Sequence, residues 1–184
     1  MLPTLLILGF IVVIGIMVAT MYNKLVMLKN RAENAWSDID VQLRRRYDLI
    51  PNLVETVKGY ATHEKETLEN VIKARQQAIS VDSIKDQGKM ENMLTGALRQ
   101  LFAVAESYPD LKANQNFLEL QNSLTQIEDQ IQQARRYYNA IVRDLNTATE
   151  KFPSNIIANM FSFQRREYFE IEEPKARENV KVKF

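Results

Sequence analysis

The feature that most constrains the fold is an apolar stripe in the second half of the chain, from Phe117 to Phe152. Apolar or amphipathic residues recur there at alternating intervals of three and four, and no proline or glycine interrupts the run. The positions are Phe117, Leu120, Leu124, Ile127, Ile131, Ala134, Tyr138, Ile141, Leu145, Ala148 and Phe152. Such spacing is typical of a helix that packs lengthwise against other helices. At ~1.5 Å per residue, this helix would be about 50 Å long.

The polar residues of this stretch indicate which kind of packing to expect. The outward positions are polar: Asn122, Asp129, Gln132, Arg136, Asn139, Arg143, Asn146 and Glu150. The positions that flank the stripe lack the opposite charges with which a two-stranded coiled coil is usually bordered. A bundle of helices from one chain is therefore the better interpretation.

Composition limits the classes of function. The 184 residues carry a formal net charge of +1, which argues against a nucleic-acid-binding surface. There is no cysteine, so neither a disulfide framework nor thiolate chemistry is available. Five glycines and five prolines are few for this length, which favours long helices.

The N-terminal segment from Leu2 to Met21 contains no charged side chain. About 20 helical residues match the ~30 Å hydrocarbon core of a bilayer, so residues 1–22 are predicted to form a transmembrane anchor. A cleaved signal peptide is the alternative. It would need a basic start, a shorter apolar run and a small-x-small cleavage site, which this segment lacks.

Three cations follow the apolar segment directly: Lys24, Lys29 and Arg31. Before it there is only the amino terminus. The positive-inside rule then predicts a single-pass protein of the cell membrane, with the N-terminus outside and the body in the cytoplasm. The same cations are suited to attract anionic lipid headgroups.

The rest of the chain is predicted to be all-α, an antiparallel, four-helix-bundle-like body over residues 23–162. The expected helices cover about 23–49, 51–79, 83–107 and 110–151, with a short one over 154–161. Pro51 is expected to break or kink the first of them near residues 48–50. From Phe163 the apolar period changes, so residues 163–184 are predicted to form a short extended tail, mobile toward its end.

Two blocks of sequence resemble the LemA family of bacterial membrane-anchored proteins. One is IDVQLRRRYDLIPNLVETVKGYATHE, residues 39–64, preceded by Ala35-Trp36. The other begins with YPDLKAN, residues 108–114, and continues with FPSNIIANMFSF, residues 152–163. With the EYFEIEEPKARENVKVKF tail, the resemblance covers essentially the whole chain.

The resemblance implies an N-terminal anchor, a helical-bundle body and no established enzymatic activity. Family members include a protein needed to form magnetosome membranes, and many are encoded beside a membrane zinc metalloprotease. Position 47 is often a histidine in such sequences and is Tyr47 here. This departure puts in doubt any metal or proton-transfer role for that position.

The residues themselves argue against catalysis. The single histidine, His63, is followed by Glu64, but Thr67 stands where a zinc-protease helix needs its second histidine. A di-iron bundle needs Glu-x-x-His on two helices, and one histidine cannot supply it. A carboxylate-only metal site remains an alternative. We therefore expect no enzyme, no cofactor and no small-molecule substrate.

We interpret the chain as a self-associating scaffold or membrane organiser. Charged residues at helical spacing form a candidate interface, with the aromatic start of the tail as a second part. These residues are Asp40, Arg44, Arg45, Arg46, Asp48, Phe163, Tyr168 and Phe169. Intrahelical ion pairing is the plainer interpretation of the charges, and docking on its own bundle is the default for the tail. An adaptor for a membrane protease in envelope stress is the alternative function.

Overall fold

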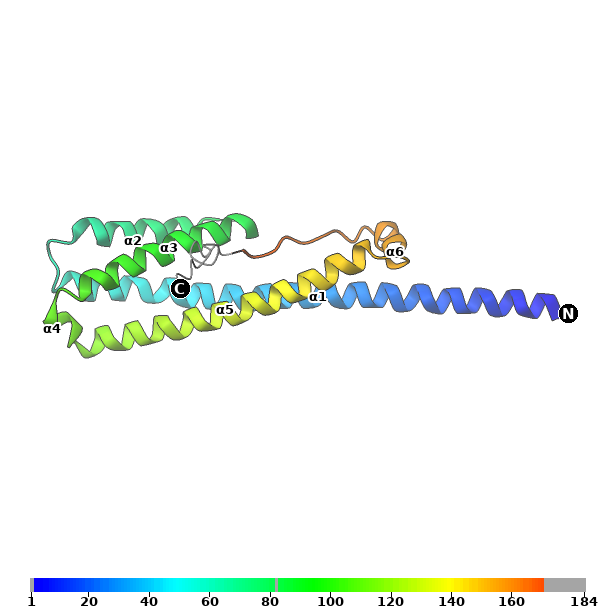
Figure 1. The fold of residues 1–184 in the computed structure, drawn as a ribbon, viewed down its shortest axis with the longest axis horizontal. Helices are drawn as coiled ribbons and strands as arrows, with labels where there is room; N and C mark the ends of the chain where they lie inside the picture. Colours follow the sequence, from blue (N-terminus) through cyan, green and yellow to red (C-terminus); the bar gives the residue numbers. More distant parts are fainter. Residues whose placement is uncertain (1, 82, 171–184) are drawn as a thin grey trace, which may run out of the picture. The chain divides into compact units, whose positions relative to one another are not determined.

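The computed structural model describes residues 2–81 and 83–170, which are mostly helical and contain no strand (Figure 1). This confirms the predicted all-α class. The helices are α1 (Leu2–Lys58), α2 (Lys65–Ile79), α3 (Ile84–Ala105), α4 (Pro109–Lys112), α5 (Gln115–Glu150) and α6 (Ser154–Met160).

The chain divides into two compact units, each described separately here. Unit 1 comprises Met1–Asp40 and Gln133–Tyr168, and unit 2 comprises Val41–Gln132 and Phe169–Phe184. The two longest helices, α1 and α5, therefore contribute residues to both units.

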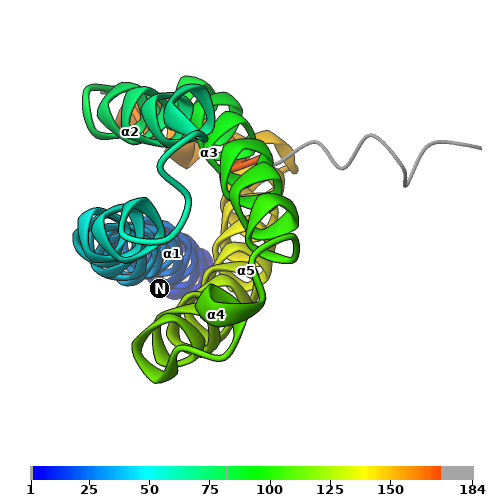
Figure 2. The ribbon, with the colours of Figure 1, turned by 90° about the vertical axis from the view of Figure 1, so that its left-hand side faces the viewer.

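Unit 2 is a helical bundle in which α2 and α3 run side by side (Figures 1 and 2). Its buried positions on α3 follow intervals of four and three: Gln87, Glu91, Leu94, Leu98, Leu101 and Ala105. Leu43, Ile50 and Leu53 of α1 are likewise buried in this unit. Each such aliphatic side chain contributes about 1.5–3 kcal/mol by leaving water, so apolar packing supplies most of the stability.

Unit 1 pairs the first part of α1 with the second part of α5. The rings of Trp36 and Tyr138 meet at 5.6 Å between centroids, and Tyr138 is fully buried. Most of the predicted α5 stripe is buried as expected, but Phe152 is 75% exposed and so does not extend it. Asn146 was predicted to face outward and is instead buried, for a reason given below.

The predicted break at residues 48–50 is wrong, because α1 continues through Pro51 to Lys58. A proline inside a helix leaves the carbonyl four residues earlier without its amide donor, here that of Tyr47. Arg75 of α2 supplies the missing donor, with its Nε 2.7 Å from the Tyr47 carbonyl oxygen. The first interruption of the chain therefore comes later, at residues 59–64, between α1 and α2.

A second predicted helix is also divided. The stretch expected over residues 110–151 forms α4 and then α5, with Ala113 and Asn114 between them. The Asn114 side-chain oxygen accepts a hydrogen bond from the Phe117 amide at 3.0 Å, which caps the start of α5.

The segment after α6 has no regular secondary structure up to residue 170, as expected of the tail. Asn146 holds it in unit 1: its amide donates to the Arg166 carbonyl at 3.0 Å and its oxygen accepts from the Arg166 amide at 2.9 Å. Tyr138 donates to the Glu167 carbonyl at 2.9 Å. Residues 163–168 thus dock on their own chain, whereas the predicted tail over 171–184 lies outside the described residues.

Candidate functional site

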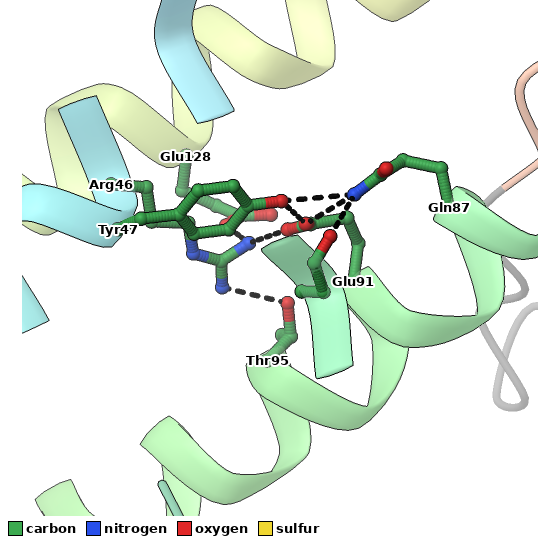
Figure 3. Close-up of polar contacts among 7 residues, drawn as sticks. Arg46, Tyr47, Gln87, Glu91, Thr95 and Glu128 are labelled. Atoms are coloured by element: carbon green, nitrogen blue, oxygen red, sulfur yellow. Dashed lines mark hydrogen bonds and ion pairs between the residues drawn. The ribbon is translucent and has the colours of Figure 1, made fainter. Parts of the chain in front are cut away.

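Unit 2 contains a cluster of polar side chains in its interior, which we call the Arg46 cluster (Figure 3). Its members are Arg46, Tyr47, Gln87, Glu91, Thr95 and Glu128. Glu91 is fully buried and Arg46 is 4% exposed. A charged pair at this depth needs a complete set of partners, because each ion has left its hydration shell.

The guanidinium of Arg46 joins three helices. Its Nη1 lies 3.1 Å from Oε2 of Glu91 on α3 and 3.2 Å from Oε2 of Glu128 on α5. Its Nη2 donates to Oγ1 of Thr95 at 2.8 Å. Because Glu128 is partly exposed and Glu91 is not, the pair with Glu91 is the one shielded from water.

The second oxygen of Glu91 is satisfied by neutral donors. The Tyr47 hydroxyl donates to Oε1, and Nε2 of Gln87 lies 3.1 Å from the same atom. The Gln87 amide also lies 2.9 Å from the Tyr47 hydroxyl and 3.0 Å from the Ala78 carbonyl. Both carboxylate oxygens therefore have partners, as a buried carboxylate requires.

Burial sets the protonation behaviour of the cluster. Loss of water raises the pKa of Glu91 above its ordinary 4.5, and the neighbouring Arg46 opposes this rise. Burial, and then the charge of Glu91, raise the pKa of the Tyr47 hydroxyl, which stays protonated and able to donate. The cluster is thus a saturated set of bonds that ties α1, α3 and α5 together.

The ionisable side chains of the Arg46 cluster are bonded to one another. Within residues 2–81 and 83–170, no group of three or more His, Cys, Asp or Glu side chains could hold a metal ion. Tyr47 stands at the position where the family often has a histidine. Its hydroxyl donates a hydrogen bond to Glu91 and accepts one from Gln87.

Unit 1 contains a pocket of about 570 Å³, which we call the Tyr22 pocket. It is lined by Tyr22, Val26, Lys29 and Asn30 of α1, Leu145 of α5, and the turn and tail residues Phe161, Ser162, Phe163, Gln164, Arg165 and Arg166. Three of these residues are cations and three are aromatic. Such a combination suits an amphipathic, negatively charged occupant.

Ring contacts and one tight turn shape the Tyr22 pocket. The Tyr22 ring meets Phe161 at 4.7 Å and Phe163 at 5.8 Å between centroids. Ser162 has φ 56, and the amide of Phe163 donates to the Ala158 carbonyl at 2.9 Å. This is the Schellman motif that ends many helices, with serine where glycine is usual.

The cations of the pocket differ in their pairing. Arg165 lies 2.9 Å from Glu150, and Arg166 lies 2.5 Å from Glu33. Lys29 makes no ion pair within the part of the chain that the structure describes. The pocket therefore keeps one uncompensated positive charge beside two that carboxylates partly offset.

The structure separates the predicted interface residues. Arg44, Arg45 and Asp48 are exposed on α1 and Asp40 is half-buried, as an interface would require. Arg46 and Phe169 are buried, so neither presents its side chain to solvent, and the Arg46 guanidinium is held by Glu91, Glu128 and Thr95. The other two aromatic tail residues, Phe163 and Tyr168, are half-buried.

The membrane-flanking cations and the histidine are all exposed to solvent. Lys24, Lys29 and Arg31 are exposed, and only Lys29 lines the Tyr22 pocket. His63 is exposed in the turn between α1 and α2.

Sequence reasoning missed both the Arg46 cluster and the Tyr22 pocket. A signal for the cluster did exist, because Gln87 and Glu91 continue the interval of four and three that begins at Leu94. Polar residues at core positions of a heptad pattern indicate a buried network. The pocket had no such signal, since residues 22–30 and 161–166 meet only through the fold.

Fold and sites together define the class: an all-α protein whose first helix, alone among the described residues, is long and apolar enough to cross a membrane. The comparison of sequences narrows this class. The chain belongs to the LemA family, whose profile matches residues 35–184, and this confirms the resemblance noted from the motifs.

Individual relatives agree with this assignment. The chain is 29% identical over 174 residues to Protein LemA of Metamycoplasma hominis, covering 91% of this chain and 78% of the relative. It is 25% identical over 174 residues to Magnetosome protein MamQ of Magnetospirillum gryphiswaldense, covering 80% and 64%. Magnetosome protein MamQ 2 of Paramagnetospirillum magneticum is 25% identical over 175 residues, with coverages of 81% and 64%. The chain thus spans just under two thirds of the length of these MamQ proteins.

Proposed function

We propose that the protein is anchored in the bilayer by residues 2–21 and works as a self-associating scaffold or membrane organiser that performs no catalysis. The observation that carries the proposal is the continuity of α1, which runs from Leu2 to Lys58. Its apolar first part is exposed along almost its whole length. An exposed run of this length and composition is costly in water and favourable in hydrocarbon.

Continuity of α1 also bears on mechanism. Because α1 has no break, no flexible linker separates the apolar run from the helical body. Arg75 preserves this continuity at Pro51, and Arg46 ties the same helix to α3 and α5. The anchor and the body are therefore joined by helix alone, which supports the scaffold.

Orientation follows from the charges beside the anchor. Lys24, Lys29 and Arg31 are exposed on α1 directly after the apolar run, which favours a body in the cytoplasm and an N-terminus outside. A protease-cleavable tag at the C-terminus of the full chain tests this. The tag should resist protease in intact cells and be cut after lysis, and cutting in intact cells would contradict the orientation.

Self-association is proposed to use the outer face of α1 in unit 2. Val41, Arg44, Arg45 and Asp48 recur at helical spacing and are all exposed, with Val41 50% exposed. An apolar residue beside both signs of charge suits a face that meets a copy of itself, since an arginine of one copy can pair with Asp48 of the other.

Arg44→Glu with Arg45→Glu should shift the full chain in mild detergent to a smaller species in native electrophoresis, with unchanged circular dichroism. The matched control is Lys73→Glu, which reverses an exposed cation on α2. An oligomer that survives the double reversal would exclude this face. A stoichiometric membrane protease that co-purifies with a monomer would instead favour the adaptor function.

The relatives support the scaffold in one respect. Part of this chain resembles proteins named for the magnetosome. A role in organising membrane is the function that this similarity and the exposed apolar helix have in common.

A further inference from the structure

We propose that the Tyr22 pocket binds the phosphate headgroup of an anionic phospholipid in the leaflet that the body faces. This inference rests on the anchor proposed above and adds a lipid specificity to it. It is argued from the position of the pocket, from its charges and from an apolar surface at its edge.

The position follows from the length of α1. Residues 2–21 span about 30 Å of helix, which matches the hydrocarbon core, so Tyr22 falls at its boundary. Lys29 is seven residues further along and therefore about 10 Å beyond that boundary. The headgroup layer is roughly 5–8 Å thick on each side. The α1 wall of the pocket, from Tyr22 to Asn30, thus crosses the level at which lipid phosphates lie.

The chemistry of the walls fits such a phosphate. Lys29, Arg165 and Arg166 line the same pocket from two segments that are more than 130 residues apart in the sequence. Arginine pairs with phosphate oxygens through two parallel hydrogen bonds, and lysine adds a point charge. The aromatic rings of Tyr22, Phe161 and Phe163 offer the other wall, where glycerol and the first acyl carbons can pack.

An apolar surface continues the pocket toward the lipid. Phe152, Ile156, Met160 and Phe161 are 75, 51, 67 and 49% exposed, while Ile157 and Ala158 of the same turn are buried. The side of α6 that carries Ile156 and Met160 is therefore exposed. The Phe161 ring touches Tyr22, so α6 stands beside α1 where the apolar run ends (Figure 1). An apolar face at that level is suited to lie in the interface plane.

Lipid binding is measured by native mass spectrometry of the full chain in a mild uncharged detergent, titrated with dioleoyl phosphatidylglycerol or dioleoyl phosphatidylcholine. The pocket variant is Lys29→Gln with Arg165→Gln. The control is Lys24→Gln with Arg31→Gln, which removes the same number of charges from the stretch of α1 around Lys29 but from outside the pocket. We expect the wild type to prefer phosphatidylglycerol, the pocket variant to lose roughly tenfold or more in affinity, and the control to change less than about threefold.

Three outcomes would overturn the proposal: equal binding of the two lipids, equal loss in both double variants, or competition by millimolar glycerol phosphate without acyl chains. The last would assign the pocket to a free anion. Membrane fractionation of the cells that produce the full chain tests the anchor separately. A chain in the soluble fraction contradicts both proposals, whereas a membrane-bound chain with an unaffected pocket variant contradicts this one alone.

Insertion of the exposed side of α6 into lipid can be measured separately by spin labelling. A single introduced cysteine takes the label, because the chain has no cysteine of its own. A spin label at Met160→Cys in phosphatidylglycerol vesicles should collide more often with oxygen than with a water-soluble nickel chelate. The same label at Lys73→Cys on α2 should show the reverse. A label at position 160 that behaves like the one at position 73 would exclude insertion of α6.

Discussion

The bond between Arg75 and the Tyr47 carbonyl predicts a strong coupling between residues 51 and 75. Arg75→Met removes the donor, and in the wild type no amide can replace it because Pro51 has none. A partly buried carbonyl left without a donor costs about 1–3 kcal/mol, and its exposure to some water places this site toward the lower end. We therefore expect Arg75→Met to lower the free energy of unfolding by about 1–2 kcal/mol.

The same substitution should cost much less in a Pro51→Ala background. Alanine restores the amide at position 51, which then donates to Tyr47 as in any helix, so the carbonyl no longer depends on Arg75. The cost of Arg75→Met should fall below about 0.5 kcal/mol, which leaves a coupling of about 0.5–2 kcal/mol. By itself, Pro51→Ala should stabilise α1, because proline is the least favourable residue inside a helix.

Urea unfolding of the full chain in detergent, followed by far-ultraviolet circular dichroism, measures all four states of this cycle. Lys73→Met is the control, since it removes an exposed cation from the same helix as Arg75 and should change stability by less than about 0.5 kcal/mol. A penalty for Arg75→Met that is the same with proline and with alanine at position 51 would refute the reasoning.

Three further predictions concern the Arg46 cluster and the tail. Arg46→Met strands the Glu91 carboxylate and should cost about 3–5 kcal/mol at pH 7.5, against less than about 1 kcal/mol when Lys89→Met breaks the exposed pair with Asp86. Burial already raises the pKa of Glu91 in the folded state, and loss of Arg46 raises it further. The penalty should therefore be largest above that raised pKa and shrink as pH falls toward 4.5; a penalty that does not change with pH in urea titrations would contradict this. Gly88→Ala places a Cβ in steric overlap with the Glu170 carbonyl oxygen, so we expect the free energy of unfolding to fall by about 1–3 kcal/mol and proteolysis near residue 170 to be faster. Unchanged cleavage would argue against this packing. Ser162→Gly relieves a left-handed φ of 56 and should raise the unfolding free energy by up to about 1 kcal/mol, whereas Ser162→Val should lower it.

Much of the fold could be predicted from periodicity alone. The apolar stripes of α3 and α5 are buried largely where the spacing predicts, because burial of one apolar face is the main source of stability for a helix in a bundle. Local signals also located the ends of α3 and α6 within two residues. The resemblance to the LemA family rested on several separated motifs and was confirmed.

The predictions that were wrong concerned residues whose partners are distant in sequence. Local rules break a helix at Pro51, but Arg75, 24 residues later, repairs the defect through a side chain. Asn146 carries the polarity of an outward residue, yet the backbone of Arg166 gives it both of its bonds. Neither partner can be inferred from the pattern around the residue itself, so such positions need the fold to be known first.

The Arg46 cluster supplies a definition of helix register that a repetitive apolar pattern lacks. Stripes with intervals of three and four match themselves after a shift of seven residues, so apolar packing alone discriminates weakly between registers of α1, α3 and α5. The bonds of Arg46 to Glu91, Glu128 and Thr95 form in one register only. In any shifted arrangement Glu91 is buried without a cation, at a cost of several kcal/mol. A cluster of this kind thereby favours one alignment of the helices of unit 2, and with it the exposed face of α1 proposed to meet a second copy.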